Sequence, residues 1–363
     1  MFDIDIELIK KYDKPGPRYT SYPTAPHFNE SFTHENYLDE IIKTNRGRDL
    51  PDLSLYFHLP FCDTLCYFCA CNMIVTRNRY RIKKYIDYLK REIDLITAHI
   101  SHDRKAVQLH WGGGTPTHLN PDEIADLSSY IHDRFDVNAD AETGCEIDPR
   151  ELTKTHLAAL KDGGFNRISM GVQDFNPDVQ KAVNRIQPEA LTRQVVDWVR
   201  ELGFHSINLD LMYGLPFQSV KTFEKTVDTI IDIDPDRIAL FNFAYVPWMK
   251  KHQKAIRPED LPVAEEKLNI LKMSTEKLTR AGYVFIGMDH FAKPDDELAQ
   301  ALEGKKLYRN FQGYSTHAGA DLYGMGITSI SQFGRIYAQN IKNEKNITPL
   351  LTKEFYQRPR DII

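Results

Sequence analysis

Four of the five cysteines of this chain lie within ten residues, in the run Cys62-Asp-Thr-Leu-Cys66-Tyr-Phe-Cys69-Ala-Cys71. Three of them have the spacing C-x3-C-x2-C, which lets one short loop bind three corners of a cubic iron-sulfur cluster and leaves the fourth iron open. An open iron can bind and reduce a ligand. Cys71 would close the cluster if it bound that iron, but a single intervening residue is a short reach to a second corner. We therefore interpret Cys71 as a non-ligand.

A structural zinc site is the alternative, because four thiolates also satisfy tetrahedral zinc. Zinc sites, however, usually draw two cysteine pairs from separated segments, with a spacer of about a dozen or more residues between them. Four thiols within ten residues leave little backbone to arrange a tetrahedron. The pattern therefore favours the iron-sulfur cluster.

The composition is that of a globular protein of 363 residues, with 42% hydrophobic and 27% charged residues. The sequence has no apolar run of the roughly 20 residues that cross a membrane, and its start lacks the apolar core of a signal peptide. We expect a cytoplasmic protein, in which clustered thiols bind metal more often than they form disulfides. The net charge of −5 argues against a nucleic-acid partner.

Short β-rich runs alternate with helical patterns along most of the chain. This alternation predicts βαβ units around a parallel sheet, and six units would make an incomplete barrel. Chemistry in parallel barrels gathers at the C-terminal ends of strands, where the cysteine run and the glycines 112–114 follow the first two predicted strands. The predicted strands are 53–58, 107–111, 145–147, 167–172, 207–213 and 237–244, and the predicted helices are 86–100, 121–133, 151–162, 189–202, 219–232 and 262–281.

The C-x3-C-x2-C spacing after a first barrel strand, with Phe68 directly before Cys69, resembles the radical S-adenosylmethionine (SAM) superfamily. Longer strings resemble one branch of it, the oxygen-independent coproporphyrinogen III oxidases, over nearly the whole chain. These strings are GPRYTSYPT (16–24), YFHLPFCDTLCYFCACN (56–72), QLHWGGGTPT (108–117), GFNRISMGVQDFN (164–176), NLDLMYGLP (208–216), FIGMDHFAKPDDEL (285–298) and RNFQGY (309–314).

This resemblance implies an α/β fold, an incomplete (β/α)6 radical SAM barrel with an N-terminal arm and an α/β extension. Residues 1–45 would form the arm near the active site, and 46–345 the catalytic barrel with its extension, which begins near residue 245. Residues 346–363 would be a polar tail where the family's helical C-terminal domain begins. We expect that domain to be absent here, so that substrate turnover is less secure than SAM cleavage.

The implied reaction is the conversion of coproporphyrinogen III to protoporphyrinogen IX in haem biosynthesis. A [4Fe-4S] cluster on Cys62, Cys66 and Cys69 would cleave SAM to a 5'-deoxyadenosyl radical. That radical would abstract a hydrogen from the propionate β-carbon, which acid-base catalysis cannot reach. Loss of CO2 and one electron then leaves a vinyl group, at two propionates in turn. The resemblance also implies two SAM molecules, an electron donor such as flavodoxin or ferredoxin, and a monomer.

The resemblance assigns SAM contacts to residues on several strands. Glycines without a Cβ would let backbone carbonyls approach the SAM amino group, and the chain lacks the G-x4-G-K-[ST] of a phosphate loop. The carboxylates could attract the sulfonium or accept from ribose hydroxyls, although strand-end carboxylates are often only loop caps. The assigned residues are Tyr56, Phe68, Gly113, Gly114, Thr115, Glu146, Gln173, Arg185, Asp210, Ala244 and Ile330.

On the substrate side the candidates are Cys71, Tyr19, Phe311 and Gln312, with Arg18 and Tyr22 in the same opening segment as Tyr19. A tetrapyrrole with four propionates requires an apolar cavity edged with cations. For Tyr19 and Tyr22, packing of the arm on the barrel is an equal alternative.

Two local departures from the family pattern qualify the match. Ala70 replaces a usual glycine, and the stretch 142–146 is less regular than the strand expected there, which affects the alignment of Glu146. The alternative functions are another radical SAM activity, a haem-trafficking relative, and a non-catalytic protein that keeps the cluster or zinc as a clip. Cys71 and the RYTSYPT string argue against the haem-trafficking relative.

Overall fold

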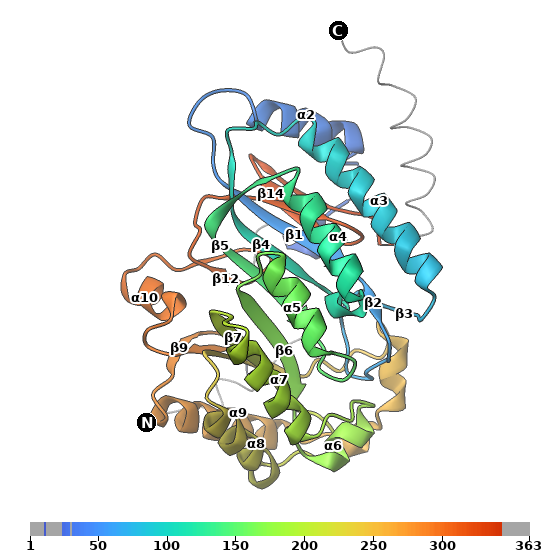
Figure 1. The fold of residues 1–363 in the computed structure, drawn as a ribbon. Helices are drawn as coiled ribbons and strands as arrows, with labels where there is room; N and C mark the ends of the chain where they lie inside the picture. The colour runs from blue at the N-terminus through green and yellow to red at the C-terminus, as the bar shows by residue number, and fades with distance from the viewer. Residues whose placement is uncertain (1–10, 12–23, 30, 343–363) are drawn as a thin grey trace.

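Six parallel strands form the centre of the fold in a computed structural model that describes Lys11, residues 24–29 and residues 31–342 (Figure 1). They lie side by side in chain order, as an incomplete (β/α)6 barrel requires, so the predicted fold is confirmed. The strands are β1 (Leu53–Leu59), β4 (Lys105–Gly113), β5 (Asp136–Ile147), β6 (Arg167–Gln173), β7 (Ser206–Tyr213) and β8 (Arg237–Asn242). The third strand is much longer than predicted, and it includes all of residues 142–146.

Helices follow these strands and cover the outer face of the sheet (Figure 1). In the first of them, apolar residues from Ile82 to Ile96 recur every three or four positions and are buried on one face. Asn78 caps its N-terminus, while Ile100 is buried just beyond its end. The helices are α3 (Arg79–Thr97), α4 (Pro121–His132), α5 (Lys154–Asp162), the short α6 (Pro177–Ala182), α7 (Glu189–Glu201), α8 (Val220–Ile233) and α9 (Ala264–Arg280).

The sheet continues beyond the barrel strands on both sides. Next to β1 lies the parallel strand β13 (Asp321–Met325), followed by the antiparallel strands β14 (Ile330–Phe333) and β15 (Ile336–Gln339). Next to β8 lie the antiparallel strands β10 (His290–Ala292) and β9 (Val284–Gly287). Within the described residues, the segments after 245 therefore supply both edges of one 11-stranded sheet.

Shorter elements complete the fold. They are α2 (His34–Thr44), α10 (Glu297–Glu303), the strand pairs β2 (Phe61–Cys62) with β3 (Ile74–Val75) and β11 (Tyr308–Arg309) with β12 (Tyr314–Ser315), and the 3-10 turns η1 (Ala25–His27), η2 (Pro116–His118), η3 (Lys251–Ala255) and η4 (Pro258–Asp260). No helix in the described part of the chain is long and apolar enough to cross a membrane.

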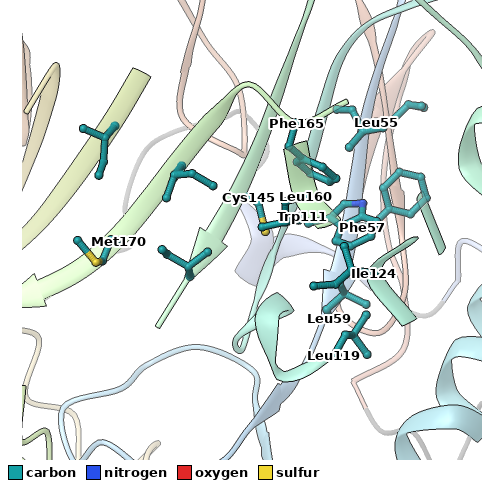
Figure 2. Close-up of a cluster of buried hydrophobic side chains, with 14 of the residues drawn as sticks. Leu55, Phe57, Leu59, Trp111, Leu119, Ile124, Cys145, Leu160, Phe165 and Met170 are labelled. Carbon is teal, nitrogen blue, oxygen red and sulfur yellow. The ribbon is translucent and has the colours of Figure 1, made fainter. Parts of the chain in front are cut away.

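The hydrophobic core lies between the sheet and its helices (Figure 2). Trp111 of β4 packs edge-on against Phe165 with ring centroids 4.8 Å apart, and Cys145 of β5 is fully buried in the same cluster. The opposite face of the sheet is polar: Ser54 donates to Gln108 at 2.7 Å, and Gln108 donates to Glu142 at 3.2 Å. Since successive side chains of a strand alternate faces, the barrel strands have one face for packing and one for chemistry.

Glu92 of α3 connects this helix to the turn between β13 and β14. Its carboxylate accepts from the backbone N–H of Gly326 at 2.9 Å and from the side-chain amide of Asn340 at 2.6 Å. On the same helix, Tyr85 donates to the carbonyl of His58 at 2.7 Å. Burial raises the pKa of Glu92 to about 7.

Replacing Glu92 tests this contact through the pH dependence of stability. Between about pH 4.5 and 7 the native state binds more protons at Glu92 than the unfolded state does. The free energy of unfolding therefore falls as pH rises through this window. We expect Glu92→Gln to gain stability relative to the wild type between pH 5 and pH 8 in urea unfolding. If the difference in unfolding free energy between the two proteins is the same at pH 5 and at pH 8, the raised pKa of Glu92 is contradicted.

Candidate active site

The cysteine loop, residues 62–72, follows β1 and has little regular structure of its own. Its internal support is the short β2–β3 pairing and one turn in which the N–H of Cys69 donates to the carbonyl of Cys66 at 3.2 Å. The loop therefore depends on contacts from distant parts of the chain.

Backbone carbonyls of the cysteine loop accept hydrogen bonds from side chains of two later segments. From the segment after α6, Asn184 donates to the carbonyl of Leu65 at 2.8 Å. From the segment after β8 come three further contacts. They join Gln253 to the carbonyl of Phe68 at 3.1 Å, His252 to that of Cys69 at 2.7 Å, and Lys250 to that of Cys71 at 2.9 Å.

The three predicted iron ligands face different partners. Cys62 Sγ lies 3.5 Å from the hydroxyl of Thr115, and Cys66 Sγ accepts from the guanidinium groups of Arg150 at 3.3 Å and Arg185 at 3.6 Å. Burial raises the pKa of the Cys62 thiol to about 12. Positive groups beside a thiolate stabilise it as a metal ligand, so the surroundings of Cys66 suit an anionic cluster.

Asp148 holds both arginines in place. One of its oxygens accepts from Arg150 at 2.6 Å and from Arg185 at 3.0 Å, and all three side chains are largely buried. Burial by itself would raise the pKa of Asp148, but the charges of Arg185 and Arg150 hold it well below the usual range. The carboxylate therefore stays ionised and fixes two cations against Cys66.

In the described part of the chain, no three His, Cys, Asp or Glu side chains come together as ligands of one metal ion. A cubic cluster takes one thiolate at each of three separate irons. The arginine contacts place positive charge beside Cys66, one of the three predicted iron ligands.

Cys71 and Cys69 differ in their proton affinity. The Cys71 thiol donates to Cys69, and this hydrogen bond lowers the pKa of Cys69 while it raises that of Cys71. Cys71 thus remains a neutral thiol at the surface of the loop. Ala70 between them is not one of the described non-glycine residues with positive φ, so its replacement of glycine costs no backbone strain.

Gly113, the last residue of β4, and Gly114, directly after it, pack closely within the protein. Gly113 has φ +115°, and a Cβ there would lie 2.5 Å from the His58 ring. A Cβ on Gly114 would lie 2.5 Å from the backbone of Pro60. Close packing against the end of β1 and the residues directly after it is a second reason for these glycines, beside the predicted approach of SAM, which stays a prediction.

Glu146 near the end of β5 lies against this glycine turn. Its carboxylate accepts from the N–H of Gly113 at 3.1 Å and lies 3.5 Å from His110. Burial opposes ionisation of Glu146, but His110 and the Gly113 amide lower its pKa. Tyr56 stacks on His110 at 6.0 Å between ring centroids and contacts His58 at 3.1 Å.

Gln173, the last residue of β6, is buried, and its side-chain oxygen has no hydrogen-bond partner among the residues that the structure describes. A buried acceptor without a partner is costly, so this oxygen points to a missing donor. On the next strand, burial and the charge of Glu146 raise the pKa of Asp210 to about 7. Asn208 donates to Asp210 at 2.6 Å.

The remaining predicted SAM contacts lie on or beside the same strands. Phe68 is buried next to Cys66 in a small apolar cluster, and the carbonyl of Ala244 accepts from Gln253 at 3.1 Å. Ile330 begins β14, where its backbone packs on Gly324, the register partner of Tyr56.

The predicted substrate residues lie at different places. Phe311 packs in an aromatic cluster with Phe28 and Tyr337, at centroid distances of 5.9 and 5.5 Å, and Gln312 is exposed beside it. Tyr19, like Arg18 and Tyr22, lies outside the described residues.

Sequence reasoning missed Asp148, Arg150, Asn184 and Gln253. A signal existed for the first two, because the charged run Asp148-Pro-Arg150 directly follows a predicted strand. Gln253 gave no signal, since it lies in an irregular segment far from the cysteines in sequence.

Together the barrel and the supported cysteine loop define a radical SAM protein. A Radical SAM superfamily model matches residues 56–230. Curated relatives named oxygen-independent coproporphyrinogen III oxidase include those of Synechocystis, 48% identical over 97% of this chain and 75% of the relative, and Escherichia coli, 47% identical over 98% and 75%. The solved E. coli coproporphyrinogen III oxidase, described as a radical SAM enzyme, matches with a TM-score of 0.90 at 46% identity over 96% of this chain and 78% of that one.

The chain therefore belongs to the oxygen-independent coproporphyrinogen III oxidase family. It spans about three quarters of the length of these relatives.

A pair of glycine substitutions tests the packing of the glycine turn. Gly47 has φ +121° with open space at its Cβ position, so Gly47→Ala carries backbone strain alone, roughly 1–3 kcal/mol of unfolding free energy. Gly113→Ala adds the collision with His58 and should cost about 1–3 kcal/mol more in denaturant unfolding. Equal losses for the two variants would show that the His58 contact is unimportant.

Proposed function

We propose that this chain converts coproporphyrinogen III to protoporphyrinogen IX without oxygen, by oxidative decarboxylation of two propionates. The observation that carries the proposal is the supported cysteine loop with Cys71. It belongs to a chain about half identical to enzymes named for this activity. The hydrogen on the propionate β-carbon is not acidic, so it must leave as a hydrogen atom rather than as a proton before CO2 is lost from the adjacent carbon.

Cys62, Cys66 and Cys69 would hold one [4Fe-4S] cluster. When bound, the cluster and SAM would supply the one-electron radical chemistry that removes hydrogen from the substrate. Arg150 and Arg185 balance the negative charge at Cys66, and Asp148 orients them. The fixed carbonyl contacts hold the thiols in position.

The SAM side would be formed by residues around Glu146. Gln173 has a buried oxygen ready to accept from a ligand N–H or O–H. Glu146 and ionised Asp210 suit a sulfonium or ribose hydroxyls, and Arg185 suits a carboxylate. We propose that two SAM molecules bind on this side. The other residues that we assign to SAM contacts are Tyr56, Phe68, Gly113, Gly114, Thr115, Ala244 and Ile330.

On the substrate side we assign Cys71, Tyr19, Phe311 and Gln312. Cys71 carries a neutral thiol at the open side of the loop, so it can donate to the reacting tetrapyrrole without binding iron. The electron would come from a flavodoxin or ferredoxin. We also propose that the protein is monomeric and works in the cytoplasm, where thiols stay reduced.

Anaerobic reconstitution tests the function directly. We expect about four irons and four sulfides per chain, 5'-deoxyadenosine from SAM under reductant, and protoporphyrinogen IX from coproporphyrinogen III. Cys71→Ser should keep the iron and SAM cleavage but lose vinyl product, whereas Cys69→Ser should lose the iron. One zinc per chain and no SAM cleavage would refute the proposal, and loss of iron in Cys71→Ser would refute the role of Cys71.

The raised pKa of Asp210 predicts pH-dependent SAM binding. Asp210 ionises around pH 7, and only the ionised form attracts the positive sulfonium. The dissociation constant for SAM should therefore fall several-fold between pH 6 and pH 8 in anaerobic calorimetry, and Asp210→Asn should flatten this change. Glu92→Gln is the matched control, because Glu92 also titrates near pH 7 but contacts Gly326 and Asn340. An unaltered profile in Asp210→Asn would contradict the role of Asp210.

A further inference from the structure

An exposed apolar and basic patch lies in the segment after β8. Trp248 and Met249 are each 72% exposed, and the next residues include Lys250, Lys251 and Lys254. We call these five residues the basic patch. An exposed apolar patch that is bordered by charged residues often marks an interaction site.

The basic patch is joined directly to the cysteine loop. Lys250 donates to the carbonyl of Cys71 at 2.9 Å, and His252 contacts the carbonyl of Cys69 at 2.7 Å. Gln253, fully buried beneath the patch, donates to the carbonyls of Phe68 and Ala244. A molecule seated on the patch would therefore lie against the loop that carries the predicted iron ligands.

The charge of the patch is opposite to that of the whole protein. Three lysines fall within five residues of a chain whose net charge is −5. Lys251 and Lys254 are exposed, while the neighbouring Arg257 is paired with Asp260 at 2.8 Å. A hollow of about 550 Å³ beside Trp248 is lined also by Tyr245, Pro247 and Ile256. Aromatic and methionine side chains with a cationic rim suit an acidic protein surface.

We propose that the basic patch is the docking surface for the electron donor, a small acidic protein that carries a one-electron centre. This inference rests on the proposed function, which consumes one electron for each SAM cleaved. The donor loses one electron at the patch, and the cluster on the adjoining loop gains it. The lysines would attract the donor, and Trp248 and Met249 would form the apolar contact.

The test compares a protein donor with a chemical one in the reconstituted full chain. The variant Lys251→Glu/Lys254→Glu reverses two exposed charges and keeps the contacts of Lys250 and His252 with the cysteine loop. The matched control, Lys221→Glu/Lys225→Glu, reverses two exposed lysines of α8. SAM cleavage is measured with reduced acidic flavodoxin at low and high salt, and with dithionite.

We expect the patch variant to lose tenfold or more in kcat/KM for flavodoxin at low salt, with dithionite-driven cleavage unchanged. The control variant should match the wild type with both donors, and Trp248→Ser should weaken only the flavodoxin reaction. Wild-type rates with flavodoxin should fall with added salt.

Several results would overturn the inference. An unchanged flavodoxin rate in the patch variant is one, and an equal loss in the control variant is another. A raised KM for coproporphyrinogen III with dithionite would assign the patch to substrate propionates, and a dimer lost on charge reversal would assign it to a second copy. Absence of dithionite-driven cleavage in the wild type would instead refute the proposed function, so the two failures are distinguishable.

Discussion

The cysteine loop is held in place by hydrogen bonds from distant segments to its backbone carbonyls, and the site depends on these contacts. The loop has one short strand pairing and one turn of its own. Asn184, His252 and Gln253 anchor carbonyls from Leu65 to Cys69. Asn184 follows α6, whereas His252 and Gln253 both follow β8, so the order of the strands in the sheet brings two distant segments to one loop.

Cations and carboxylates lie in different places around the cysteine loop. Arg150 and Arg185 neutralise the side of Cys66, and Asp148 fixes them both. Glu146 lies on β5 and Asp210 on β7, and burial together with the charge of Glu146 raises the pKa of Asp210. The cations beside Cys66 suit the anionic cluster that we propose there, and the two carboxylates suit the sulfonium of the proposed SAM.

The barrel could be predicted from the sequence because its signals are local. Five of the six strands begin within about two residues of their predicted starts, and only β5 was greatly underestimated, since its polar residues from Asp136 to Thr143 obscure the strand pattern. The pairing of β13 with β1 joins residues more than 250 apart and leaves no local trace. The same is true of Gln253. Gly113 was found from the sequence, but its packing against His58 could not be predicted, because the contact depends on how two strands pair.

The central claim is that three thiolates of the preformed loop hold a cluster with one distinct iron. The most direct test is Mössbauer spectroscopy of the chain reconstituted with 57Fe, recorded before and after SAM is added. The account predicts that SAM changes the spectrum of one iron in four and leaves the other three unchanged, and that Cys71→Ser behaves identically. If SAM changes the spectrum of none of the four irons, or if the chain takes up no iron, this central claim is contradicted.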